Sequence, residues 1–189
     1  MDTSSRFLPL EAARHRTLMS FGLVIGGSLL LTLSAKLQVP FWPVPMTLQT
    51  GVVLLFAILM GPRLALATIG LYLAQGAAGL PVFAGTPEKG LGLAYMMGPT
   101  GGYMVGWLLA AAFLGWAAQH LRRAMLLFGA ALLAVALNYT PGIIWLAQFT
   151  GWENAFALGA VPFILGDVVK AALAVALALA VRGAVTRQR

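Results

Sequence analysis

The sequence contains no cysteine and very little charge. Of its 189 residues, 9% are charged and only five are acidic, whereas 60% belong to the hydrophobic class. A soluble domain carries about 25% charged residues, so this chain is predicted to be an integral membrane protein rather than a soluble enzyme or a disordered tail. The lack of cysteine excludes disulfides, thiol catalysis and metal sites built on Cys.

The sequence also lacks the motifs of common catalytic and energy-coupling sites. It has no GxxxxGK[ST] phosphate loop, so the chain does not hydrolyse ATP by that route. No GxSxG motif surrounds Ser28, and His15 and His120 are too far apart in sequence to suggest a metal pair. We therefore expect no enzyme, metal site or cofactor, and we expect any energy-coupling domain to lie on another polypeptide.

Six apolar runs predict an all-α, polytopic membrane protein with six transmembrane helices in a single membrane domain. A spanning helix needs about 20 apolar residues, and the chain has room for six spans and little else. The predicted spans cover residues 17–35, 48–60, 64–76, 101–120, 124–149 and 155–181. Residues 1–16 form a polar lead, residues 17–181 the bundle, and residues 182–189 a tail.

The basic residues predict that both termini are cytoplasmic. With the N-terminus inside, nine of the twelve Lys and Arg residues fall in cytoplasmic segments, and only Lys36 and Lys89 fall in outer loops. This distribution explains the net charge of +7 without a nucleic-acid partner. The alternative, a signal peptide cleaved after Ala35, would leave an odd number of spans.

Asp167 and Lys170 stand out because both charges lie inside the sixth predicted span. Intramembrane charges are expensive and indicate a functional site by default. At a spacing of three residues they share one helix face, where the carboxylate accepts hydrogen bonds and the ammonium donates them. The pair is therefore suited to a small solute that presents an N–H beside a carbonyl or carboxylate, although it can also serve only to orient the helix.

Two further segments are candidates for ligand contact. Gln75 and Asn138 are polar groups at membrane depth, and Pro141 is expected to break the fifth span near Asn138 and so open a cavity. The long outer segment 79–100 is rich in glycine and is expected to form a lid between the third and fourth helices. Its candidate contact residues are Phe83, Lys89 and Tyr95.

Small residues at four-residue spacing predict close helix packing. Gly22 and Gly26 in the first span and Gly102 and Gly106 in the fourth are such pairs. Packing within the monomer is the simpler explanation. The alternative is that the Gly22/Gly26 face docks a partner membrane protein.

Five motifs in order resemble the BioY family of biotin-specific substrate-binding (S) components of energy-coupling-factor (ECF) transporters. They are PVPMTLQT at 43–50, GPR at 61–63, GLPVFAG at 79–85, GPTGGY at 98–103 and PFILGDVVK at 162–170. The resemblance covers nearly the whole chain from residue 17 onward. It implies a multi-pass protein of the cytoplasmic membrane of a prokaryote that captures biotin from outside.

The resemblance also implies the ligand contacts and the partners. Asp167 and Lys170 match the D-x-x-K pair of the family's sixth helix and would meet the ureido ring of biotin. Phe83 and Tyr95 would cover the thiophane ring, and Lys89 would meet the carboxylate. The implied partners are an ECF transmembrane coupling protein and cytoplasmic ATPase subunits, besides the lipid bilayer and a possible second copy of the chain.

Two other functions stay open at the level of the sequence. One is a stand-alone, proton-coupled secondary transporter of a small vitamin-like solute, with Asp167 as the proton-coupling carboxylate. The other is a membrane scaffold that binds no solute and assembles through its small-residue faces.

Overall fold

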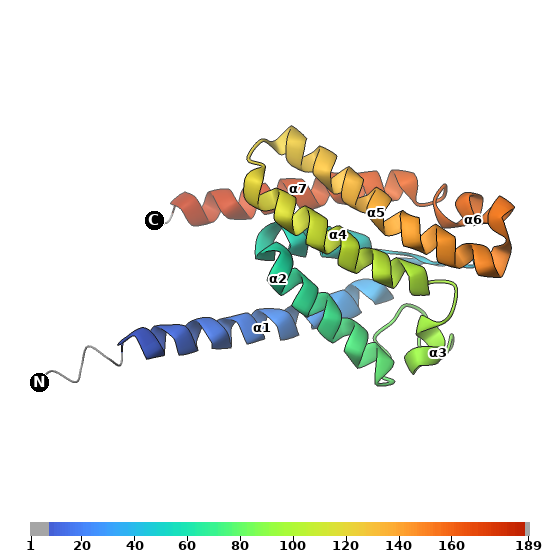
Figure 1. Cartoon of the computed structure of the whole chain (residues 1–189), viewed down its shortest axis with the longest axis horizontal. Coiled ribbons are helices and arrows are strands. Elements are labelled where there is room, and N and C mark those ends of the chain that lie inside the picture. Colours follow the sequence, from blue (N-terminus) through green and yellow to red (C-terminus); the bar gives the residue numbers. More distant parts are fainter. Residues whose placement is uncertain (1–7, 188–189) are drawn as a thin grey trace, which may run out of the picture.

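The computed structural model describes residues 8–187, and it describes side chains over residues 17–184. Seven helices and a short antiparallel strand pair make up this part of the chain (Figure 1). In order they are α1 (Leu8–Lys36), β1 (Gln38–Val39), β2 (Met46–Thr47), α2 (Gln49–Ala77), α3 (Gly92–Met96), α4 (Gly101–His120), α5 (Ala124–Thr150), α6 (Trp152–Gly159) and α7 (Ile164–Arg187). Part of the predicted polar lead, residues 1–7, lies outside the described residues.

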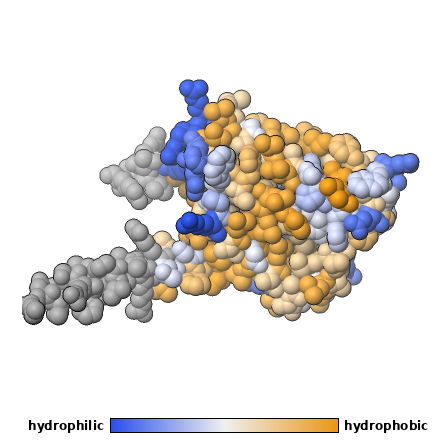
Figure 2. All heavy atoms as spheres, viewed as in Figure 1, coloured by the Kyte–Doolittle hydropathy of each residue, from blue (hydrophilic) through white to orange (hydrophobic). Residues whose placement is uncertain are grey.

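Five of these helices are long and apolar enough to cross a membrane: α1, α2, α4, α5 and α7. Figure 2 shows the corresponding surface, with hydrophobic residues in a belt across the middle and hydrophilic residues towards the ends. The beginning of α1 and the end of α7 lie on the same side of the bundle, whereas α3 and α6 lie at the opposite end (Figure 1). The chain is therefore a multi-pass membrane protein.

Helix α2 is folded back on itself at Gly61. This residue has φ 73° and ψ 175°, a conformation open essentially only to glycine, and Pro62 follows it. Gln49 donates a hydrogen bond of 2.8 Å to the Tyr72 hydroxyl, although the two residues are 23 positions apart. In one straight helix they would lie about 34 Å apart. The two arms of α2 are thus antiparallel, and the predicted turn at residues 61–63 between the second and third apolar runs is confirmed.

The elbow of α2 is supported by two neighbouring helices. Pro62 has no N–H to donate to the carbonyl of Ile58, and the guanidinium of Arg182 on α7 donates to that carbonyl instead. On α4, a Cβ at Gly115 would lie 2.7 Å from the Pro62 nitrogen. The elbow therefore requires a glycine opposite it as well as the glycine within it.

The glycine pairs in the first and fourth predicted spans have different environments. A Cβ at Gly102 would lie 2.3 Å from the carbonyl oxygen of Pro141, and a Cβ at Gly106 would lie 2.4 Å from that of Asn138. Their absence of side chains allows α4 and α5 to approach backbone to backbone. By contrast, nothing lies within 4 Å of a Cβ built at Gly22 or Gly26, so that face of α1 is open.

Two predicted boundaries are wrong. The predicted break at residues 138–142 is absent, since α5 runs without interruption through Pro141. Proline has a helical φ and removes one N–H only, so a well-packed membrane helix tolerates it. The predicted sixth span, 155–181, is divided into α6 and α7, because Pro162 disfavours a helical conformation at the residue before it and α7 begins at Ile164.

Candidate ligand-binding cavity

A cavity of about 580 Å³, including its open mouth, lies between the starts of α2, α4 and α7. Its wall comes from six parts of the chain that the bundle brings together. The residues are Val44, Pro45, Met46, Thr47, Gln49, Thr50, Tyr72, Phe83, Ala84, Tyr95, Thr100, Tyr103, Met104, Trp107, Asn138, Tyr139, Phe163, Asp167 and Lys170.

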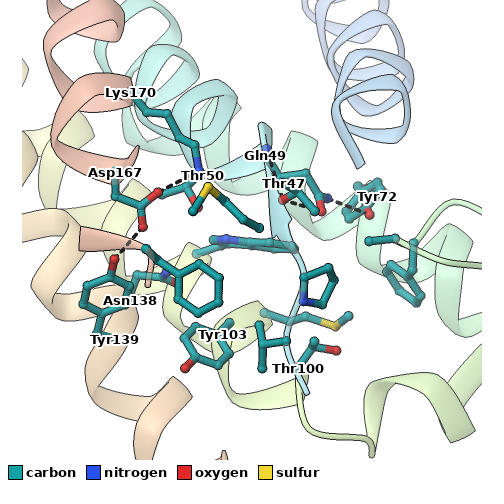
Figure 3. Close-up of a pocket in the computed structure, with 18 of the residues that line it drawn as sticks. Thr47, Gln49, Thr50, Tyr72, Thr100, Tyr103, Asn138, Tyr139, Asp167 and Lys170 are labelled. Carbon is teal, nitrogen blue, oxygen red and sulfur yellow. Dashed lines mark hydrogen bonds and ion pairs between the residues drawn. The ribbon is translucent and has the colours of Figure 1, made fainter. Parts of the chain in front are cut away.

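One side of the cavity carries an ion pair and a tyrosine hydroxyl (Figure 3). Lys170 Nζ lies 2.8 Å from Asp167 Oδ1, and the Tyr139 hydroxyl donates to Asp167 Oδ2 at 2.7 Å. Asp167 is 3% exposed, so its charge depends on these two partners. A carboxylate offers about four acceptor positions and an ammonium three donors, so both groups retain hydrogen-bonding capacity towards a ligand.

Asn138 adds a polar side chain beside this ion pair (Figure 3). It is 3% exposed. Among the buried side-chain nitrogen and oxygen atoms of residues 17–184, its Oδ1 is the one without a hydrogen-bond partner. A buried amide oxygen without a partner is unfavourable by roughly 1–3 kcal/mol. Asn138 lines the cavity, and its Oδ1 lies against α4 at Gly106, where an added Cβ would be 2.5 Å from it.

A second polar group lies across the cavity and is internally satisfied. The Thr47 hydroxyl interacts with Gln49 Oε1 at 3.3 Å, Gln49 Nε2 donates to Tyr72, and Tyr72 donates to the Val82 carbonyl at 3.1 Å. This chain of bonds connects both arms of α2 with the segment that follows it. It orients Gln49 and Tyr72 and leaves them less capacity for a ligand than Asp167 and Lys170 have.

Aromatic rings form the apolar wall of the cavity. The Phe83 ring stacks on Tyr95 with centroids 4.9 Å apart and meets the edge of Tyr72 at 5.4 Å. Trp107 lies on the other side of Tyr72, at a centroid distance of 6.3 Å. The Phe83 ring occupies the space that a side chain at Gly76 would fill, because a Cβ there would lie 1.9 Å from its Cζ.

The short helix α3 supports the same wall. The Tyr95 hydroxyl donates to the Ala84 carbonyl at 2.7 Å. Burial raises the pKa of Tyr95 above its ordinary value, so the hydroxyl keeps its proton and stays a donor. Trp145 on α5 donates to the Gly98 carbonyl, which fastens the end of the 79–100 segment.

The cavity as a whole is suited to a small, largely apolar solute with a polar head. The head would face Asp167, Lys170 and Asn138, and the apolar part would lie along the aromatic wall. Within the described residues, no three His, Asp or Glu side chains are close enough to hold a metal ion.

The model of the BioY family matches residues 8–187. The chain belongs to the BioY family. A relative from Pyrococcus horikoshii named "Probable biotin transporter BioY" is 39% identical over 154 residues, which are 82% of this chain and 90% of the relative. A "Biotin transporter BioY2" of Lactococcus lactis is 31% identical over 170 residues, with 88% and 92% coverage.

A solved structure has the same fold. It is a crystal structure of the S-component for biotin from an ECF-type ABC transporter, and it covers 89% of this chain and 93% of its own. The TM-score is 0.79 and the sequence identity 24%. The BioY resemblance of the five motifs is thereby confirmed, and the family's named relatives are transporters rather than enzymes.

The structure brings five of the seven candidate ligand contacts of this BioY family member to the cavity. These are Phe83, Tyr95, Asn138, Asp167 and Lys170. Gln75 is partly buried on α2 but is not among the lining residues. Lys89 is exposed, and its stem lies over Gly85, next to the lining residue Ala84.

Several lining residues were not singled out from the sequence as binding candidates. Tyr72, Tyr103 and Trp107 are aromatic residues within apolar spans, where the bilayer, a packed core and a cavity give the same signal. Gln49 and Tyr139 are polar residues within apolar runs. Gln49 and Tyr103 lie within the motifs at 43–50 and 98–103, which is the signal that could have found them.

Proposed function

We propose that this protein captures biotin from outside the cell and serves as the substrate-binding S component of an ECF-type biotin uptake system. The observation that carries the proposal is the Asp167–Lys170 pair, buried in the cavity of a BioY family member. The names of the relatives supply the ligand, and the cavity supplies matching chemistry.

The polar head of biotin fits the charged side of the cavity. Its ureido ring has two N–H donors and one carbonyl acceptor. Asp167 accepts from an N–H, Lys170 donates to the carbonyl, and Asn138 offers its side-chain amide beside them. All three lie on adjacent faces of α5 and α7 (Figure 3).

The thiophane ring then lies against Phe83, Tyr95 and Trp107. The carboxylate of biotin needs a cation, and we assign it to Lys89. In the structure Lys89 is exposed and its stem lies over Gly85, so we propose that the 79–100 loop moves to bring its ammonium to the carboxylate. The loop is therefore proposed to act as a lid.

The proposed membrane topology has six crossings with both termini in the cytoplasm. Each arm of α2 counts as one crossing, because Gln49 and Tyr72 meet at the outer end and Gly61 lies at the inner end. The membrane is then the cytoplasmic membrane of a prokaryote. The partners are an ECF transmembrane coupling protein and ATPase subunits, with the open Gly22/Gly26 face of α1 as the docking surface.

Equilibrium biotin binding to the detergent-purified protein tests this function. We expect tight binding, read from quenching of tryptophan fluorescence, and a loss of at least tenfold in affinity, or about 1.4 kcal/mol, in Asp167→Asn and in Lys170→Met. The matched control is Glu153→Gln, which removes an exposed carboxylate on α6 and should bind like the wild type. Binding by the wild type that neither cavity variant weakens would reject these contacts, and no binding at all would reject biotin.

The same protein separates this function from proton-coupled transport. In the structure both carboxylate oxygens of Asp167 already have a partner, Lys170 on Oδ1 and Tyr139 on Oδ2, which favours a ligand-contact role for this side chain. Uptake by the protein alone that follows the proton gradient would contradict the S-component function.

A further inference from the structure

The segment 82–86 is the part of the long outer loop that walls the cavity, and side chains from three helices hold its backbone. Tyr72 on α2 donates to the carbonyl of residue 82, and Tyr95 on α3 donates to that of residue 84. The carbonyl between them, at Phe83, accepts from Lys36 at 2.9 Å. Three consecutive carbonyls are thus each bonded to a different helix.

Lys36 makes more of these bonds than either tyrosine. Its Nζ also donates to the Thr86 carbonyl at 3.2 Å and to the Thr86 hydroxyl at 3.1 Å. An ammonium has three N–H donors, and two loop residues, Phe83 and Thr86, together supply three acceptors for them. Although Lys36 is an exposed residue, Thr86 is buried, and charge-assisted bonds are about twice as strong as neutral ones.

The position of Lys36 gives these bonds a role in ligand retention. It is the last residue of α1, the helix at the edge of the bundle that packs mainly on α2 (Figure 1). Lys36 holds the carbonyl of Phe83. Phe83 is only 1% exposed, and it forms part of the cavity wall. Loss of the ammonium would remove three hydrogen bonds from the segment that carries Phe83, while Lys36 itself lies outside the cavity lining.

We propose that Lys36 is a positioning residue that fastens the 82–86 segment over the cavity and thereby sets how fast the ligand leaves. The identity of the ligand in this proposal rests on the proposed biotin function. The contacts between Lys36 and the loop do not depend on that function. Lys36 touches no ligand and lies outside the cavity lining. Its effect is therefore expected in the dissociation rate constant more than in the association rate constant.

The test measures biotin dissociation from Lys36→Met, Lys36→Arg and Thr86→Val in detergent. We expect Lys36→Met to raise the dissociation rate constant about tenfold, the equivalent of about 1.4 kcal/mol, with little change in association. Lys36→Arg should restore most of the retention, because a guanidinium offers five donors. The control is Arg123→Met, which removes an exposed positive charge far from the loop and should behave like the wild type.

Hydrogen exchange of the ligand-free protein tests the fastening independently. We expect faster amide exchange over residues 82–90 in Lys36→Met, and normal exchange in Arg123→Met. Unchanged exchange together with unchanged biotin dissociation would overturn the proposal. If the wild type bound no biotin, the biotin function would fail, and the exchange result would still decide whether Lys36 holds the loop. If Lys36→Met does not fold, Thr86→Val, which removes the hydroxyl acceptor of Lys36, should show the faster dissociation and the faster exchange instead.

Discussion

Replacing Gly106 with alanine is expected to force α4 away from α5 and to damage the fold and the cavity together. A Cβ at Gly106 would lie 2.4 Å from the backbone oxygen of Asn138 and 2.5 Å from its Oδ1. Carbon atoms at rest are about 3.5 Å or more from such neighbours, so the helices must separate by about 1 Å. The nearest obstacle is backbone and cannot move aside as a flexible side chain would.

The size of the effect follows from what this separation breaks. Inserting a methyl group into a close-packed site costs about 1–3 kcal/mol. If α5 yields, the 2.7 Å bond between the Tyr139 hydroxyl and Asp167 Oδ2 is disturbed, because Tyr139 follows Asn138 on the same helix. Asn138 is then displaced from its place in the cavity wall. Biotin affinity should fall along with stability.

The assay combines thermal unfolding in detergent with a biotin titration. For a chain of this size 1 kcal/mol changes Tm by about 2–4 °C, so Gly106→Ala should lower Tm by at least about 2 °C. The matched control is Gly129→Ala on α5, where nothing lies within 4 Å of the added Cβ. The reasoning would be refuted if Gly106→Ala kept the Tm and the biotin affinity of this control.

Two further predictions follow from α2 and its neighbours. Gly76→Ala should displace the Phe83 ring, which a new Cβ would meet at 1.9 Å, and so weaken biotin binding. The control is Gly70→Ala in the same helix, which has open space around the added Cβ and should bind biotin normally. Equal biotin affinities of the two variants would contradict the place of Phe83 in the cavity wall. Because the chain has no cysteine, Arg63→Cys and Glu88→Cys provide single labelling sites in intact cells. A membrane-impermeant thiol reagent should reach Glu88→Cys from outside and Arg63→Cys only after permeabilisation, whereas labelling of both from outside would reject the folded-back topology.

Local features of the sequence were sufficient to predict the class of protein and much of the fold. The scarcity of charge predicted a membrane protein, and the apolar runs predicted helices that the structure contains with shifted ends. The turn at residues 61–63 was predictable because glycine and proline restrict the backbone locally. Asp167 and Lys170 were predictable as a pair because three residues along a helix always place two side chains on one face.

Proline showed the limit of this local reasoning. Pro62 begins the second arm of α2, Pro162 precedes the start of α7, and Pro141 lies inside an unbroken helix. Whether a freed carbonyl is tolerated depends on what packs beside it. At the elbow the donor is Arg182, more than a hundred residues away from the Ile58 carbonyl in sequence.

The composition of the cavity was decided by tertiary structure alone. Gln49 reaches Tyr72 because α2 folds back, and Tyr139 reaches Asp167 because α5 packs against α7. Lys36 and Lys89 look alike in the sequence and both are exposed, yet Lys36 is bonded to the Phe83 carbonyl whereas the stem of Lys89 lies over Gly85. Spacing along a helix sets which of its own residues share a face. Contacts between helices depend instead on how closely their backbones approach. Here Gly106 on α4 sets that approach for Asn138 on α5.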